Sequence, residues 1–498
     1  MRGSLCFAAL AVLMAATNGC SEWHTEADIS GPSAYGSPGS SMGATQGGVQ
    51  DMSFARELVE QGKVPPADAL IVEAMFSEHD LPLQGAPCST VLCLRAAMGV
   101  APSATEQPSA WVQVGMSSTV DPNSFERPTQ AIVATVDVSG SMGWGYPNDQ
   151  TAGSISRELL YAIAGELDEQ DRFAMVTYGS TVQQATPWLP GGDGSIDAAI
   201  AALSEGGSTN MEGGLTVAYQ LAGEALGQAD EVRILLFTDV QPNVGATSAG
   251  AFETMAANGA DRGIGLTVFG VGLGMGAEVF QAMSHLRGGN AFSLVSTAAV
   301  EPFMEDNWPW FVSPIAYDLS VQAEPSANLE LAEAYGFPKS GDAPSASLDV
   351  ATVFLSKRRG GLLLELAPLG DASLEPSQVD LSLSYVDQHG QPFSETLTAS
   401  FDGSGRLDDR GIYMPQDGIA KAVSLALLVS GMRDAAELYG SDRAAAIERL
   451  SPTLDRFAAD AAAIADADLQ TEAEFWPQLL TLMEQGATQG SFYGEYGY

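Results

Sequence analysis

Basic residues are scarce in this chain of 498 residues, because 21 Lys and Arg stand against 62 Asp and Glu, a formal net charge of −41. Nucleic-acid binding depends on clustered Lys and Arg, so this charge argues against a nucleic-acid partner, and it disfavours anionic membrane surfaces in the same way. The acidity is explained most simply by the solubility and self-repulsion of an exposed surface. A preference for cationic partners or metal ions is the alternative.

Long hydrophobic runs are also missing. No apolar run reaches about 18 residues, so we expect no membrane-spanning helix, and the run from Val423 to Met432 predicts a buried helix instead. The composition, with 45% hydrophobic and 17% charged residues, is that of a globular protein. At roughly 100–200 residues per domain, the length allows about two to four domains.

The first twenty residues have the pattern of a secretory signal, with Arg2 followed by an almost purely apolar stretch from Leu5 to Ala16. This segment, 1–20, ends in Thr17-Asn-Gly-Cys20, which resembles the lipobox of bacterial lipoproteins, whose cysteine is lipidated. Lipoboxes usually carry an aliphatic residue where this chain has Thr17. Two outcomes therefore stay open, lipidation at Cys20 and simple signal cleavage.

The residues after Cys20 indicate how such a protein would be attached to the cell envelope. Ser21 stands where an Asp is associated with inner-membrane retention, so the analogy favours the outer membrane or the cell surface. Residues 21–50 are rich in Gly and Ser and predict a flexible tether. We therefore expect an exported, lipid-anchored protein of the cell envelope that meets the membrane only through its N-terminal lipid.

Cysteine and histidine are too sparse for a zinc site, which needs four ligands. The four histidines are scattered at long intervals: His24, His79, His285 and His389. Cys6 lies in the signal and Cys20 is the lipidation candidate, which leaves Cys88 and Cys93 as a nearby pair. In an exported protein the default for such a pair is a disulfide.

Residues 128–311 alternate between short apolar runs and helical segments. The run 233–238 has almost no polar alternation, as expected for a parallel strand covered by helices on both faces. The expected strands are 131–136, 172–178, 181–188, 233–238, 266–271 and 291–295, and the expected helices are 154–167, 196–203, 211–226, 249–261 and 277–287. This order predicts an α/β fold with a doubly wound, mostly parallel sheet, in which ligands bind at the carboxyl ends of the strands.

Oxygen-bearing side chains follow the predicted strands at that edge. The first strand runs into a loop with a carboxylate and two hydroxyls at alternate positions, a second loop opens a helix, and a third follows the strand 233–238. The candidate ligands are Asp137, Ser139, Ser141, Thr209 and Asp239. Such a set suits a hard divalent cation, with Mg²⁺ first and Mn²⁺ or Ca²⁺ as alternatives.

The order and placement of these three elements resemble the metal-ion-dependent adhesion site of von Willebrand factor type A domains. The resemblance implies that the metal keeps one coordination position open, which a Glu or Asp carboxylate of a protein partner fills. Val240 is a departure, because the family commonly has Gly after the aspartate. That bulk is expected to alter access to the loop without removing a ligand.

The flanking regions resemble a bacterial subfamily of exported von Willebrand A proteins, in which a small N-terminal segment precedes the domain and a β-rich module plus helices follows it. Here the leader is 51–127, and 312–412 alternates like an antiparallel β-sandwich, with strands expected at 315–322, 351–356, 361–367 and 379–385. Residues 413–490 predict helices. The Trp-rich stretch 307–311 predicts packing between domains, with a sugar-binding surface as the alternative. The tail 491–498 is expected to be frayed, with a docking peptide as the alternative.

Three functions are compatible with this pattern. The leading hypothesis is a metal-dependent protein-binding module without enzymatic activity. Metal-assisted hydrolysis is the second, but no histidine lies in the three loops, and Glu212, the extra acid nearby, stands in a helix first turn where acids commonly complement the dipole. The third is an envelope assembly scaffold whose site binds no metal.

Overall fold

One of the two sheets contains parallel strands, and their carboxyl ends share one edge, where ligands bind in sheets of this kind. The computed structural model describes residues 43–46, 52–120, 125–145, 150–239, 249–272, 289–308, 310–337, 345–356, 359–403 and 407–490. These residues all belong to one compact unit, Pro38–Tyr498. Several expectations lie outside the described residues: the signal 1–20 with Cys20, the helix at 277–287, Val240 and the tail 491–498.

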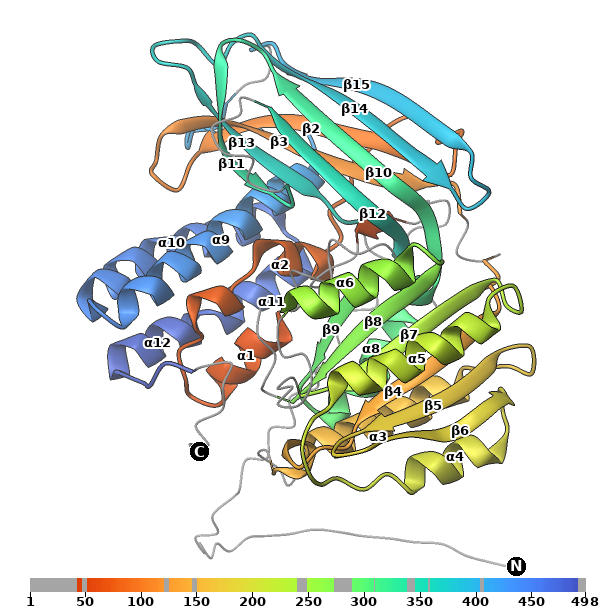
Figure 1. Cartoon of the computed structure of the whole chain (residues 1–498). Helices are drawn as coiled ribbons and strands as arrows, with labels where there is room; N and C mark the ends of the chain where they lie inside the picture. The colour runs from red at the N-terminus through yellow and green to blue at the C-terminus, as the bar shows by residue number, and fades with distance from the viewer. Residues whose placement is uncertain are drawn as a thin grey trace, which may run out of the picture. The chain divides into compact units, whose positions relative to one another are not determined.

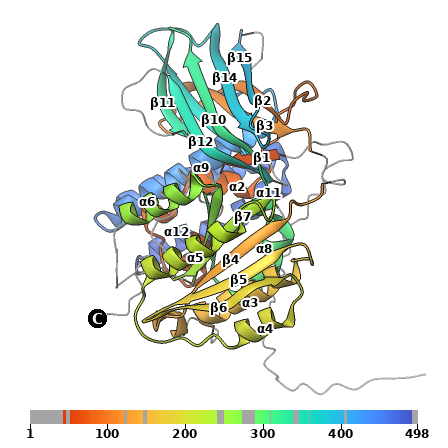
Figure 2. The same ribbon diagram turned by 45° about the vertical axis from the view of Figure 1, so that its right-hand side comes forward.

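The first sheet has the strand order β6-β5-β4-β7-β8-β9, and Figure 2 shows β7, β4, β5 and β6 side by side. The parallel strands are β4 (Gln130–Asp137), β5 (Arg172–Tyr178), β7 (Glu231–Thr238), β8 (Ile264–Val271) and β9 (Gly289–Leu294). The edge strand β6 (Val182–Pro190) is antiparallel to β5. The chain runs from β4 to β5 on one side and later to β7 on the other, so the strand order reverses at β4.

Helices cover both faces of this sheet (Figure 1). One hydrophobic core lies under α3 (Ala152–Gly165), α4 (Gly194–Ala201) and α8 (Val300–Asn307), and the other lies under α5 (Met211–Ala225) and α6 (Ala249–Ala260). Successive residues of β4 alternate between the cores, so every residue of the strand is buried and polar alternation is absent. The predicted doubly wound α/β fold is confirmed.

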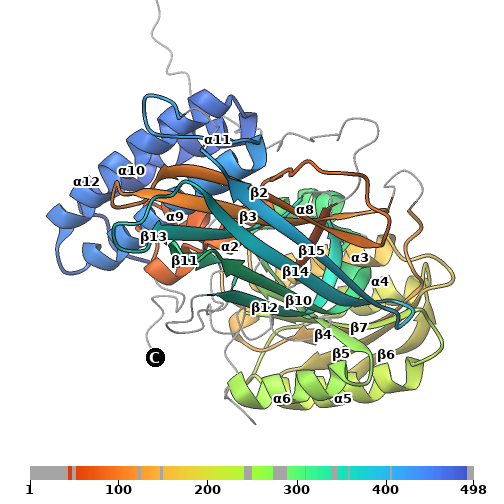
Figure 3. The ribbon, with the colours of Figure 1, turned by 90° about the horizontal axis from the view of Figure 1, so that it is seen from above.

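The second sheet is antiparallel and folds over on itself as a sandwich. One group of strands contains β2 (Leu92–Pro102), β3 (Pro108–Ser118), β13 (Leu362–Pro368) and β11 (Leu329–Tyr335). The other contains β12 (Ala346–Ser356), β10 (Pro314–Pro325), β14 (Ser377–Asp387) and β15 (Pro392–Phe401). Apolar residues of both groups share one core, and Figure 3 shows these strands from above.

Two features of the sandwich differ from the sequence-based expectation. The strand β1 (Gly43–Gln46) pairs with both β3 and β12, although these residues were expected to belong to the tether 21–50. Its pairing uses the backbone, which needs no apolar periodicity. The strands β2 and β3 also join the sandwich, although they precede the α/β domain in the leader segment 51–127. β3 is buried almost throughout, so it lacks the alternation that marks a half-exposed strand.

The helices at the two ends of the chain form one helical layer. It contains α1 (Ser53–Glu60), α2 (Val72–Glu78), α9 (Asp417–Tyr439), α10 (Arg443–Ile464), α11 (Ala467–Phe475) and α12 (Pro477–Gln485), which share a hydrophobic core with Trp111 of β3. Val64 and Gln489 form a backbone bridge within it. Among the described residues, no helix is long and apolar enough to cross a membrane. The α/β domain is thus inserted in sequence between β3 and β10.

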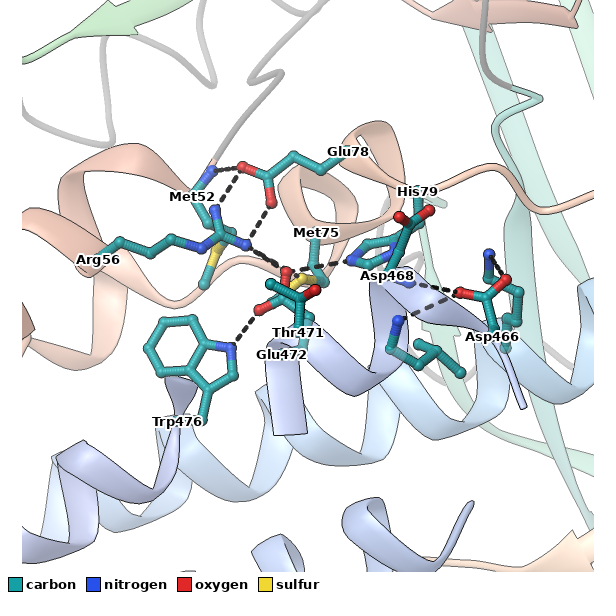
Figure 4. Close-up of polar contacts among 12 residues, drawn as sticks. Met52, Arg56, Met75, Glu78, His79, Asp466, Asp468, Thr471, Glu472 and Trp476 are labelled. Atoms are coloured by element: carbon teal, nitrogen blue, oxygen red, sulfur yellow. Dashed lines mark hydrogen bonds and ion pairs between the residues drawn. The ribbon is translucent and has the colours of Figure 1, made fainter. Parts of the chain in front are cut away.

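A buried polar cluster fastens α1, α2 and α11 together (Figure 4). The guanidinium of Arg56 lies 2.6 Å from a carboxylate oxygen of Glu78 and 2.7 Å from one of Glu472. His79 Nε2 lies 3.3 Å from the same oxygen of Glu472, and Trp476 Nε1 donates to the second oxygen over 2.7 Å. Glu472 therefore joins residues from both ends of the chain at one point.

The Trp-rich stretch lies where the inserted domain meets the sandwich in sequence. Trp308 is buried in a core of the α/β domain, whereas Trp310 is buried in the sandwich core and its ring centroid lies 5.1 Å from that of Phe125. The side chain of Gln130 donates to the backbone oxygen of Val312 over 3.2 Å. Both indoles are thus buried in cores, as the packing interpretation expects.

Candidate metal centre

The candidate ligands lie where the strand order reverses. Asp137 is the last residue of β4, and Asp239 directly follows Thr238, the last residue of β7, which pairs with β4. Thr209 directly precedes Asn210, the N-cap of α5, whose side chain accepts a hydrogen bond from the N–H of Gly213 over 3.0 Å. The sequence order predicted this placement, because parallel strands end at the same edge.

Short hydrogen bonds shape the first loop. The backbone N–H of Ser139 donates to Asp137 Oδ1 over 2.8 Å, which turns the chain back over the strand end. The hydroxyl oxygens of Ser139 and Ser141 lie 3.2 Å apart. The loop therefore gathers a carboxylate and two hydroxyls at one point, as their alternate spacing predicted.

Backbone hydrogen bonds tie the second loop to the first. Gly140 N–H donates to the oxygen of Gly207 over 3.0 Å, and Gly206 N–H donates to the oxygen of Val138 over 2.8 Å. Gly207 has a φ of +85°, and a Cβ at this position would lie 2.1 Å from the hydroxyl oxygen of Ser180. Glycine is therefore required here, and the paired loops bring the segment that carries Thr209 beside the first loop.

Burial makes the carboxyl groups of Asp137 and Asp239 weaker acids than usual. Asp137 is 1% exposed and Asp239 is 7% exposed. Burial raises the pKa of Asp137, although hydrogen bonds from Ser139 and Thr238 lower it. Burial and, next, the charge of Asp137 raise the pKa of Asp239 to about 6, and a hydrogen bond with Ser141 lowers it. The pair therefore holds concentrated negative charge in a poorly hydrated place.

These residues fit a hard divalent cation. Oδ1 of Asp239 is buried and has no hydrogen-bond partner within the described ranges, and a bound cation would compensate this oxygen. Two carboxylates and three hydroxyls are the donors that Mg²⁺, Mn²⁺ or Ca²⁺ accept. In the described part of the chain, no cluster of three or more His, Cys, Asp or Glu side chains is placed to hold a metal. The present site differs from such a cluster because it combines two carboxylates with hydroxyl groups.

Two residues at the site were missed by the sequence analysis. Thr238 is fully buried and its hydroxyl donates to Asp137 Oδ2 over 3.2 Å. Tyr178 is also fully buried, and its hydroxyl donates to the backbone oxygen of Phe237 over 3.4 Å. Burial and the charge of Asp137 raise the pKa of Tyr178 well above its usual value. Each residue is the last of a strand beside the site, and this position at a strand end is the sequence signal that could have identified it.

Thr238 is expected to position Asp137 for the cation. Replacing Thr238 by valine keeps the side-chain shape but removes the donor, so we expect Mg²⁺ affinity to fall about 10-fold and the unfolding free energy to fall by about 1–2 kcal/mol. Calorimetric titration and denaturant unfolding measure the two effects. Thr238→Ser, which keeps the hydroxyl, serves as the control. Equal affinity in wild type and Thr238→Val would remove this role.

The remaining residues considered in the sequence analysis are not part of the three loops. Of the described histidines, His79 belongs to the helical layer and His389 to the turn between β14 and β15. Glu212 stands in the first turn of α5, as predicted. Cys88 and Cys93 form a disulfide with a Cα–Cα distance of 5.6 Å.

Comparison with known proteins identifies the inserted domain. Residues 132–241 match the family model of the von Willebrand factor type A domain. The uncharacterized protein YfbK of Escherichia coli (strain K12) is 30% identical over 276 residues, which are 54% of this chain and 47% of YfbK. Inter-alpha-trypsin inhibitor heavy chain H1 of Mesocricetus auratus is 24% identical over 221 residues, 43% of this chain and 24% of that protein. The chain thus matches less than half the length of these curated relatives.

Two solved structures are similar at low identity. The von Willebrand factor type A protein from Catenulispora acidiphila is 13% identical, with a TM-score of 0.47 over 80% of this chain and 91% of that one. The ArnB paralog VWA2 from Sulfolobus acidocaldarius is 13% identical, with a TM-score of 0.41 over 80% of this chain and 100% of that one. The family match over 132–241 falls on β4 to β7 and the loops between them, and the inserted α/β domain therefore has the fold of a von Willebrand factor type A domain.

Proposed function

We propose that this chain is a metal-dependent protein-binding module of the bacterial cell envelope. A von Willebrand factor type A domain indicates a protein-interaction or adhesion role. The observation that carries the finer proposal is the buried, unpartnered Oδ1 of Asp239 among the described residues, next to Asp137 and the serine hydroxyls. The residues that would hold the cation are Asp137, Ser139, Ser141, Thr209 and Asp239.

A cation bound by these residues would supply a positive charge that a Glu or Asp carboxylate of the partner could coordinate. The residues of the chain prepare the site. Asp137 and Asp239 provide the negative charge, the serine loop directs two hydroxyls, and the paired backbones of the first two loops keep the ligands in place. The binding step transfers no atoms, so the chain is proposed to be a binding protein and not an enzyme.

Export and lipid anchoring are part of the proposal. The support is the disulfide between Cys88 and Cys93, because disulfides persist in oxidising compartments. The signal-like segment and Cys20 supply the anchor in this proposal. Labelling cells with a radioactive or clickable fatty acid, followed by recovery of the protein, tests it. Loss of the label in Cys20→Ser supports the anchor, and an unlabelled wild-type protein contradicts it.

Calorimetric titration of the protein with Mg²⁺, Mn²⁺ and Ca²⁺ tests the metal site. We expect saturable binding that is absent in Asp137→Ala, because this change removes one of two charged ligands. Glu212→Gln is the matched control, since it removes an acid of the neighbouring helix α5 and leaves the ligand set complete. Retention of metal binding in Asp137→Ala would refute the proposed site. Loss of metal binding in Glu212→Gln would show that the metal ligands include Glu212 and differ from the proposed set.

A further inference from the structure

The disulfide between Cys88 and Cys93 closes a short loop that leads into the sandwich. Cys93 is the second residue of β2, pairs with Ser117 of β3 and is 4% exposed. Cys88 is half-buried in the loop before the strand, and the residues on either side of it, Pro87 and Ser89, are exposed. Cys88 is therefore the more accessible end of the disulfide.

This disulfide is expected to add little to the stability of the sandwich. A cross-link stabilises a fold mainly by restricting the unfolded chain, and the effect is smallest for short loops. Here the two cysteines are five residues apart in sequence. β2 also pairs with β3 along its whole length, from Leu92 to Pro102, so the strand is held in the sheet without the cross-link. We therefore expect the disulfide to open while the protein stays folded.

The guanidinium of Arg95 lies beside one sulfur of this disulfide. It donates to Cys88 Sγ over 3.3 Å and to the carbonyl oxygens of Leu94 and Ala86. Among the described residues none of its hydrogen-bond partners is a carboxylate, although the chain contains 62 Asp and Glu. A Cβ at Gly85 would lie 2.9 Å from Cδ of Arg95, so the loop packs closely against the stem of this side chain. The fold thus holds a positive charge at Cys88.

This arrangement favours negative charge on the sulfur of Cys88. A cation beside a cysteine stabilises the thiolate relative to the thiol, and a stabilised thiolate is the better leaving group in thiol–disulfide exchange. The same cation attracts an attacking thiolate towards Cys88, in a chain whose formal net charge of −41 otherwise repels anions. Accessibility and charge therefore select the same cysteine as the point of attack.

We propose that the Cys88–Cys93 disulfide is a thiol-exchange site that a dithiol protein reduces in the folded chain. One thiolate of the dithiol attacks Cys88 Sγ, the bond between the cysteines breaks, and Cys93 leaves with the electron pair and takes up a proton. The second thiolate of the dithiol then attacks the partner's sulfur in the mixed disulfide and releases Cys88 as a thiolate beside Arg95. Two electrons pass to the cysteines, the dithiol becomes a disulfide, and of its two protons one is balanced on Cys93 and the other goes to water.

Reduction of the intact protein by thioredoxin tests the inference. The oxidised chain is incubated with thioredoxin, thioredoxin reductase and NADPH, and free thiols are alkylated with iodoacetamide and mapped by mass spectrometry. We expect Cys88 and Cys93 to become alkylated while circular dichroism stays native. A thioredoxin whose second active-site cysteine is replaced by serine should be trapped on Cys88. Resistance to reduction until denaturant unfolds the protein, or trapping on Cys93, would overturn the inference.

Variants of Arg95 test the role of its charge. In Arg95→Gln we expect the equilibrium constant for reduction in dithiothreitol redox buffers, and the rate of Cys88 alkylation at pH 6, each to fall about 10-fold. Arg95→Lys keeps the charge and is expected to retain most of both. Arg262→Gln is the matched control, since it removes one positive charge from the turn between α6 and β8 of the other sheet. Wild-type values in an Arg95→Gln protein that thermal unfolding shows to be folded would overturn the inference.

Discussion

Asp239→Asn is expected to weaken Mg²⁺ binding by about 100-fold or more while leaving the protein folded. The change keeps the size of the side chain and removes one of the two carboxylate charges, and loss of even an indirect partner of a metal ligand commonly costs about 10- to 100-fold in affinity. Calorimetric titration measures the loss directly. Binding of a carboxylate-bearing peptide in Mg²⁺ is expected to disappear with it.

The stability of the same variant separates a lost site from a lost fold. The pKa of Asp239 is raised to about 6 by burial and by Asp137, so near neutral pH its ionised form destabilises the metal-free protein. In EDTA we therefore expect the melting temperature of Asp239→Asn to equal or exceed that of wild type. Full metal affinity in the variant would contradict the role of Asp239. A lower melting temperature in EDTA would contradict the electrostatic argument.

Glu472→Gln is expected to lower the unfolding free energy of the helical layer by about 3 kcal/mol near neutral pH. Glu472 is 7% exposed and accepts from Arg56 and Trp476, so the change removes one of the two carboxylates that compensate Arg56, leaves only Glu78 to do so, and weakens the acceptor for the buried indole N–H. Hydrogen exchange of α1, α2 and α11, followed by mass spectrometry, measures the opening free energy locally. Glu474→Gln is the matched control, because that side chain is exposed on the same helix.

The pH dependence of the wild type follows from the same cluster. Desolvation by burial, the largest influence, raises the pKa of Glu472, but the charge of Arg56 and contacts with His79 and Trp476 lower it to about 2, against 4.5 for a free glutamate. Because the folded-state pKa is depressed, the stability it contributes is complete above about pH 4.5 and is lost as the pH falls towards 2. Thermal unfolding at pH 7 and pH 3 should show a larger drop in wild type than in Glu472→Gln. Parallel pH profiles would contradict this assignment.

The α/β domain was predictable because its signals are local. Its strands are buried on both faces and therefore read as unbroken apolar runs, and the predicted strand Arg172–Tyr178 coincides with β5. The sandwich was only partly predictable. β2 and β3 pair with strands that follow the inserted domain, and no local pattern in 92–118 records that pairing. The helical layer has the same limitation, since α1 packs with helices from the other end of the chain.

The site shows a similar division between local pattern and spatial environment. The alternate carboxylate and hydroxyls of the serine loop, and an aspartate after an apolar strand, are legible in sequence. Two features of the site arise only where segments meet in the folded chain: the burial of Asp239 and the hydrogen bond from the Thr238 hydroxyl to Asp137. The lipidation site Cys20 and the departure at Val240 stay predictions.

The insertion between β3 and β10 also sets an order of events as the chain is synthesised from its N-terminus. The strands of the inserted α/β domain are consecutive in sequence, so its sheet can form without waiting for any later part of the chain. α1, α2, β2 and β3 emerge earlier but must wait for strands and helices that follow the inserted domain, and Val64 waits for Gln489. The earliest segment is therefore completed last, which exposes its apolar surface to chaperones and proteases for most of the protein's synthesis.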